Sequence, residues 1–151
     1  MLNNIAILLV VTGVLACGEA KKDELSPYIQ KIQNLEAHSK KLATYKSYLK
    51  TPGMENKADA VKETYQALLD ELQKIELENK KIRSAHNALV RGLTEAKRKI
   101  GETSSPTFVV TAGRSIKYAD DTFDKFYNTL QRLWKDSGKT EAFPLQWEVL
   151  E

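Results

Sequence analysis

The sequence predicts an all-α protein: an elongated antiparallel three-helix coiled-coil bundle with one long central helix. Three observations support this class. The chain of 151 residues is rich in Lys, Glu, Leu and Ala and contains only 7 Gly and 4 Pro, which favours helix. Helix start and stop signals recur along it. Between those signals the apolar residues follow a repeat of three and four residues, as in a coiled-coil seam.

Boundary signals predict three helices, near residues 26–50, 55–101 and 106–136. Ser26-Pro27 and Ser105-Pro106 each combine an N-cap residue with a proline that suits the first helical turn. Thr51-Pro52-Gly53 and Ser137-Gly138 are stop signals. The helical domain is therefore expected to span residues 26–139.

The central helix would be about 70 Å long at about 1.5 Å per residue. Its seam runs through Ala58, Val61, Tyr65, Leu68, Leu72, Ile75, Asn79, Ile82, His86, Leu89, Leu93, Ala96 and Ile100. Gly92 is its weakest point, and Gly113 is a similar point in the third helix. A more compact three-helix bundle, bent at Gly92, is the alternative architecture.

The flanking helices carry the same rhythm and are expected to fold back on the central helix from its two ends. A turn at Pro52-Gly53 would pair Leu42 with Tyr65 and Tyr28 with Asn79. A turn near Thr103 would pair Leu89 with Ile116 and Ala96 with Val109. Both flanking helices would then overlap near Leu72 to Asn79 and form a three-helix waist.

The charge pattern agrees with this pairing. Residues 21–50 carry seven Lys and three acids, whereas residues 55–78 carry three Lys and seven acids. Residues 79–101 carry seven basic residues and one acid, and residues 102–151 carry six basic and eight acidic residues. Each flanking helix therefore faces the half of the central helix with opposite charge, and such charges select partner and orientation.

The C-terminal segment, residues 140–151, is too apolar for a disordered end. It contains Phe143, Leu145, Trp147, Val149 and Leu150. We expect it to pack on the waist, where Tyr28, Phe126, Tyr127 and Trp134 gather.

The first residues have a different character. Residues 1–18 contain no charged side chain, and the run from Ile5 to Ala16 is apolar. It is shorter than the roughly 20 residues that span a bilayer, and it has the length of a secretory signal. The only cysteine, Cys17, ends this run.

Val14-Leu15-Ala16-Cys17 resembles the lipobox of bacterial lipoproteins. The resemblance implies a signal peptide over residues 1–16, diacylglycerol transfer to the Cys17 sulfur, cleavage after Ala16 and acylation of the new amine. Residues 17–25 would form an acylated tether to a membrane of the bacterial cell envelope. Gly18 after the cysteine fits release to an outer membrane, where the host has one. Departures from the pattern are an n-region without Lys or Arg and the bulky Leu15.

Few residues suggest chemistry. His86 next to Asp120 and Asp121 permits a metal or acid-base site, although a seam histidine hydrogen-bonded to a carboxylate is the favoured interpretation. Asp120, Asp121 and Asp124 lack EF-hand spacing. Lys97-Arg98-Lys99 suits either an anionic surface or the helix dipole. Asn79 would specify the seam register or mark the change from two-helix to three-helix packing.

These patterns predict no catalytic residue, no cofactor and no metal, and the net charge of +3 is too small to indicate nucleic acid binding. The expected function is a non-enzymatic, membrane-anchored protein with a helical surface for a protein partner or for self-assembly. Some apolar residues outside the seam must cover the waist or the C-terminal segment, and any left exposed would form a patch for another chain; these residues are Ile29, Leu69, Leu77 and Val90. A small-ligand or lipid-binding bundle, with a pocket at Phe126, Trp134 and Trp147, is the alternative, and an enzyme is the third.

Overall fold

A computed structural model of the protein describes residues 23–49, 53, 58–100 and 107–145. These residues form five helices and no strand, so the all-α class is confirmed for them. The helices are α1 (Leu25–Gln33), α2 (Glu36–Leu49), α3 (Ala58–Gln73), α4 (Lys80–Lys99) and α5 (Phe108–Asp136).

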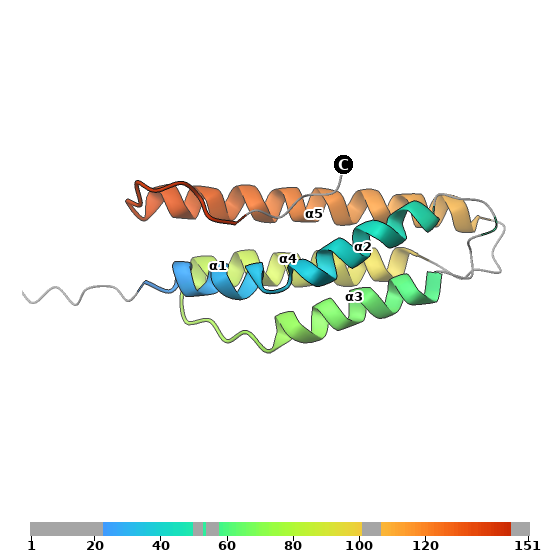
Figure 1. The fold of residues 1–151 in the computed structure, drawn as a ribbon, viewed down its shortest axis with the longest axis horizontal. Helices are drawn as coiled ribbons and strands as arrows, with labels where there is room; N and C mark the ends of the chain where they lie inside the picture. The colour runs from blue at the N-terminus through green and yellow to red at the C-terminus, as the bar shows by residue number, and fades with distance from the viewer. Residues whose placement is uncertain (1–22, 50–52, 54–57, 101–106, 146–151) are drawn as a thin grey trace, which may run out of the picture.

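The helices form an up-and-down bundle with four legs (Figure 1). The first leg consists of α1 and α2 in succession; α3 then runs back, α4 runs forward and α5 runs back again. The successive helices α2, α3, α4 and α5 pack against each other, and α2 also contacts α5, which closes the ring.

The prediction of one long central helix is wrong. The stretch expected to be continuous from 55 to 101 is two helices, α3 and α4, which pack against each other in antiparallel orientation. The break lies at residues 74–79, and α4 continues past Gly92 without interruption. Folding back allows both halves of the seam to face a four-leg core, whereas a straight rod would leave each half with little more than one partner helix.

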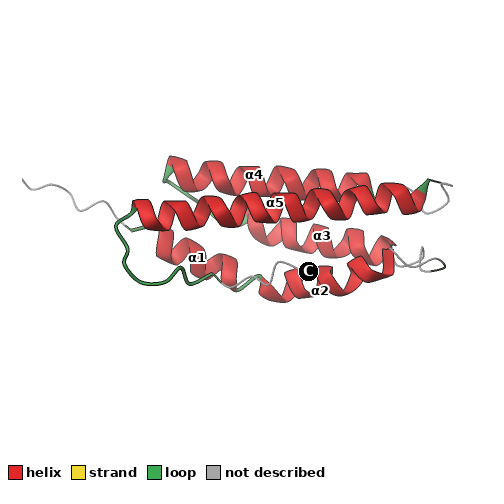
Figure 2. Ribbon diagram, turned by 90° about the horizontal axis from the view of Figure 1, so that it is seen from above, coloured by secondary structure: helices red, strands yellow, loops and turns green. Residues whose placement is uncertain are grey.

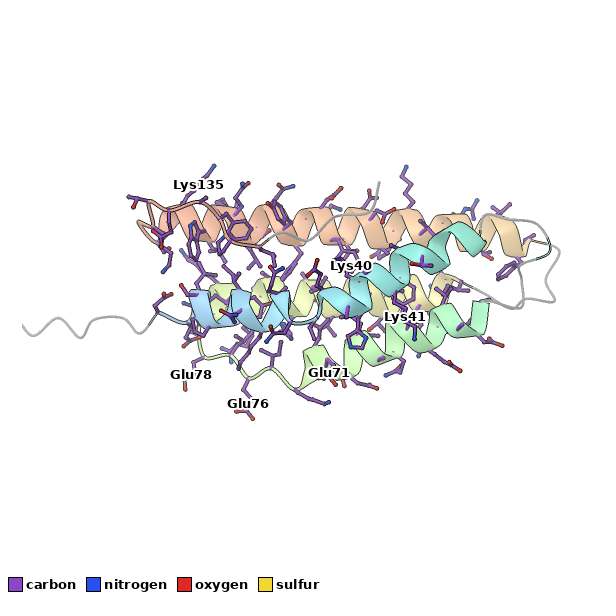
Figure 3. All side chains as sticks on the ribbon, viewed as in Figure 1. Lys40, Lys41, Glu71, Glu76, Glu78 and Lys135 are labelled. Atoms are coloured by element: carbon purple, nitrogen blue, oxygen red, sulfur yellow. The ribbon has the colours of Figure 1, made fainter. Side chains whose placement is uncertain are left out.

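The connection between α3 and α4 is extended. Ile75 and Leu77 are half-buried against the core, whereas Glu76 and Glu78 are exposed and point away from the bundle (Figure 3). This alternation has the period of two that belongs to extended chain. Asn79 then starts α4 as its N-cap, since its side-chain oxygen accepts hydrogen bonds from the backbone N–H groups of Lys81 and Ile82.

The first predicted helix is also divided. Backbone bonds from Leu35 N to Ile32 O and from His38 N to Leu35 O tighten the chain between α1 and α2. Leu35 and Leu42 nevertheless remain buried, as the seam predicted. The helix begins one residue before Ser26, and Asp23 caps it by accepting from the N–H groups of Leu25 and Ser26.

Helices α4 and α5 are in close contact, and their register differs from the prediction. The Ser115 hydroxyl donates to the Ala96 carbonyl at 2.6 Å, and the Thr111 hydroxyl is 3.2 Å from the Ile100 carbonyl. A Cβ added at Gly92 would lie 2.3 Å from Thr122 Cγ2. Ala96 thus faces Ser115 rather than position 109, a shift of about one heptad, which an apolar seam accepts equally well.

The segment after α5 packs on the bundle, as predicted for its described part. The helix ends at Asp136, and Gly138, with φ +76°, reverses the chain. Leu145 is buried, and the Phe143 ring packs edge-on against Trp134 and Tyr127. Figure 2 shows this loop returning toward the α1 side of the bundle. Residues 146–151, including Trp147, lie outside the described residues.

Candidate functional site

The residue expected to anchor the protein lies outside the described part of the chain. Cys17 and the whole signal motif belong to residues 1–22. The first residue that the structure describes is Asp23, and its carboxylate lies 2.7 Å from Lys139 Nζ. The last part of the expected tether is thereby joined to the segment that follows α5. A hydrogen bond from Lys139 is the main cause that lowers the pKa of Asp23 to about 2, and the Ser26 hydroxyl contributes.

His86 has a different partner from the predicted carboxylate. Its Nδ1 lies 3.2 Å from the Tyr28 hydroxyl, and both side chains are buried. Burial lowers the pKa of His86, while a hydrogen bond to the backbone of Leu72 acts in the opposite direction. Burial also raises the pKa of Tyr28 far above its ordinary value. Both groups are therefore neutral near pH 7, and the pair joins α1, α3 and α4.

A second buried polar cluster joins α3, α4 and α5. Ser115 is fully buried, and its hydroxyl bonds to the Ala96 carbonyl. Tyr65 is also buried, which raises its pKa strongly, while a hydrogen bond with Ser115 partly opposes this effect. Each group in the cluster has a partner, as a buried polar group requires. The sequence pattern did not indicate this cluster, because Tyr65 was assigned only as an apolar seam residue.

Asn79 does not specify a seam register. It is exposed and caps α4, and its backbone N–H donates to the Glu24 carboxylate at 2.8 Å. Glu24 and Asn79 therefore hold the start of α1 beside the start of α4. Tyr28 lies one turn further along α1 and meets His86 and Phe126 instead of Asn79.

The charged clusters show local pairing. Within the described residues, no group of three or more His, Cys, Asp or Glu side chains is placed to hold a metal ion. Arg98 and Lys99 pair with Glu95, and the Arg98 hydrogen bonds are the main cause that lowers the pKa of Glu95 to about 2. Lys97 donates to Gln66 of α3, and Lys99 lies over the Tyr118 ring.

The apolar residues outside the seam do not form the predicted exposed patch. Ile29 and Leu69 are buried, and Leu77 and Val90 are half-buried against the core. Among the side chains that the structure describes, the large apolar ones that are exposed are Val110 and Tyr118, both on α5. Ile29 and Leu69 are buried because the ring of four legs covers more of the surface of α1 and α3 than a three-helix waist would.

The expected aromatic pocket is filled in its described part. Trp134 is buried against Phe143, and its indole N–H donates to the Glu141 carbonyl at 3.0 Å. Phe126 is buried as well and makes an edge contact with Tyr28. The aromatic residues therefore form two packed clusters, one around Tyr28 and one around Trp134, rather than one waist.

The outer face of α4 and α5 carries a long groove. Two hollows share Ala85, Ala88 and Thr129 and thus form one depression, which we call the α4–α5 trough. Small residues of α4 line it: Ser84, Ala85, Ala88 and Gly92. Its charged residues are Lys81, Arg91, Lys125, Arg132, Asp121 and Asp136. None of the four basic side chains forms an ion pair with a residue that the structure describes.

In the described ranges, no helix has both the length and the apolar character needed to cross a bilayer. Comparison of the chain with protein-family models, with curated proteins and with solved structures finds no match.

Proposed function

We propose that this chain is a non-enzymatic lipoprotein of a bacterial cell envelope, anchored through Cys17, which holds a helical bundle at a membrane for contact with other molecules. The observation that carries the proposal is the motif Val14-Leu15-Ala16-Cys17 at the end of an uncharged apolar run. The single cysteine of the chain stands where the acyl acceptor of such a motif is required. Two or more acyl chains hold a protein on a membrane durably, whereas one chain gives marginal binding.

The geometry of the bundle supports a short tether. Only five residues separate Cys17 from Asp23, so the acylated residue lies within about 20 Å of Asp23 at about 3.5 Å per residue. Asp23, the connection at residues 74–79 and the end of α5 lie at the same end of the bundle (Figure 1). We infer that this end of the bundle lies nearest the acylated residue.

Packing also supports a rigid scaffold rather than a pocket for a small molecule. Trp134 and Phe126 are occupied by neighbouring aromatic rings, and the buried tyrosines have polar partners. Helix faces outside the α4–α5 trough are then left for a protein partner or for copies of the same chain.

Labelled palmitate incorporation in a bacterial host tests the anchor. The unmodified chain should incorporate label, and Cys17→Ser should abolish it. Ala20→Ser is the matched control, because it introduces serine beside the motif without altering it and should keep the label. Equal labelling of the chain and of Cys17→Ser would refute the proposal.

A further inference from the structure

Charge is divided between two sides of the bundle. Residues 58–79, which comprise α3 and the extended connection, carry six acidic and two basic residues. Helix α4 carries seven basic residues and one acid. That acid, Glu95, is already engaged by Arg98 and Lys99. The α4 side of the molecule is therefore strongly basic and the α3 side acidic.

The basic side chains of the α4–α5 trough form no ion pair within the described part of the chain. Its cations lie along both helices, and Lys81 and Arg91 alone are about 15 Å apart along α4. Two carboxylates, Asp121 and Asp136, accompany the four cations, which leaves a net charge of +2 on the trough. A surface with several negative charges over this length would complement it.

The trough begins where the tether emerges. A further hollow, lined by Asp23 and Leu25, shares Lys81, Leu133 and Asp136 with the near end of the trough. The hollows therefore continue from the first described residue along the outer face of α4 and α5. A lipid anchor attached within about 20 Å of Asp23 therefore places the near end of the trough close to the headgroup layer.

We propose that the α4–α5 trough docks on an anionic lipid surface, so that the anchored bundle lies with its α4–α5 face on the headgroups. This rests on the proposed acylation of Cys17. Basic side chains near an anionic bilayer act as a second membrane signal beside an acyl chain. The same anionic surface repels the acidic α3 side. This repulsion fixes how the bundle is rotated about its long axis relative to the membrane. The small trough residues allow lipid phosphates to approach between the long basic side chains.

A single thiol in the trough tests this docking. The acylated full-length protein with Ala88→Cys carries one free thiol, which takes a fluorophore, and it is reconstituted in phosphatidylcholine vesicles with or without phosphatidylglycerol. Quenching by a water-soluble quencher should fall several-fold when phosphatidylglycerol is present. The same label at Gln73→Cys is the control: Gln73 is exposed on α3, and the contact between Gln66 and Lys97 places it near the height of Ala88. Its quenching should not change.

Charge variants identify the cause. Arg91→Gln with Lys125→Gln should reduce the docked-to-undocked ratio by about 25-fold, since each cation near an anionic surface contributes about fivefold, or about 1 kcal/mol. Lys62→Gln with Lys74→Gln removes the same charge from α3 and the connection after it, and should leave protection of the label at Ala88 intact. Salt at about 1 M should also expose the label, because the screening length falls to about 3 Å.

Three outcomes would overturn the proposal. Equally strong quenching of the label at position 88 in both kinds of vesicle would show that anionic lipid does not cover the trough. Protection of this label from the quencher in both kinds of vesicle would indicate that a protein, such as a second copy of the chain, covers the trough. If the label stays protected in the variant with Arg91→Gln and Lys125→Gln, these two charges are excluded as the cause of docking. The mass of the same sample shows whether the chain is acylated. An unmodified Cys17 would refute the proposed anchor. An acylated chain whose label at position 88 stays exposed would refute only the docking.

Discussion

Gly92 permits the closest approach between α4 and α5, and its replacement by alanine should destabilise the bundle. A Cβ at this position would lie 2.3 Å from Cγ2, 2.5 Å from Oγ1 and 2.9 Å from Cβ of Thr122. Rotation of the Thr122 side chain would move the first two atoms but not its Cβ, and its hydroxyl already bonds to the Tyr118 carbonyl. The two helices must therefore separate. Alanine gains about 1 kcal/mol of helix propensity over glycine, whereas overpacking costs about 1–3 kcal/mol.

We expect Gly92→Ala to lower the free energy of unfolding by about 1 kcal/mol, measured by urea unfolding followed by circular dichroism. Gly113→Ala is the matched control, since a Cβ there meets nothing within 4 Å, and it should stabilise the protein by up to about 1 kcal/mol. In a Thr122→Ala background the effect of Gly92→Ala should shrink, because the two closest atoms are gone. Equal stabilisation by Gly92→Ala and Gly113→Ala would refute the close packing of α4 on α5.

Three further predictions concern the start of α4, the buried histidine and the C-terminal segment. Asn79→Ala should lower the free energy of unfolding by about 1 kcal/mol, whereas Asn79→Asp should keep the cap; equal losses would contradict the capping role. Because burial lowers the pKa of His86, the unfolded chain binds its proton first, and stability should fall as the pH drops below the ordinary histidine value of 6.5. His86→Gln should weaken this dependence between about pH 7 and about pH 5, and an unchanged slope would exclude His86 as its source. Leu145→Ala should cost about 2 kcal/mol and alter tryptophan fluorescence, because Leu145 is buried; an unaffected stability would show that this segment does not pack on the bundle.

The helices themselves could be predicted, since composition, capping residues and seam periodicity are local properties. The third helix was placed correctly to within two residues at its start, and Ser137-Gly138 ends it as expected. The pairing of the first helix with the acidic segment and of the third with the basic segment was also confirmed. Charge therefore identified the contacts of α2 with α3 and of α4 with α5, but not those of α3 with α4 or of α2 with α5.

The break between α3 and α4 was missed because the seam continues through it. Leu72, Ile75, Asn79 and Ile82 keep the spacing of three and four residues across the connection. The available signal was the alternation over residues 75–78, followed by an asparagine, a preferred N-cap residue. Long-range packing decided the outcome, since the two halves bury more apolar surface against each other than along a rod.

The register of α4 on α5 and the partner of His86 depend on contacts that no local pattern encodes. A seam with a seven-residue repeat tolerates a shift of one heptad, and the approach of Gly92 to Thr122 selects the observed register. His86 of α4 meets Tyr28 of α1 across the core of the bundle, an arrangement that follows from the missed break. The α4–α5 trough was likewise hidden, because it is formed by two helices whose relative register was unknown.

The measurement that tests this architecture most directly is a crosslink between two engineered cysteines, one on α3 and one on α4. The contact between Lys97 Nζ and Gln66 Oε1 places these positions side by side, whereas a continuous helix would separate them by about 46 Å. With Cys17 replaced by serine, the pair Gln66→Cys and Lys97→Cys should be joined within one chain by a short bis-maleimide crosslinker, seen as a monomer of altered mobility on a denaturing gel. A pair that the crosslinker does not join, or that it links only between chains, would contradict the folded-back bundle.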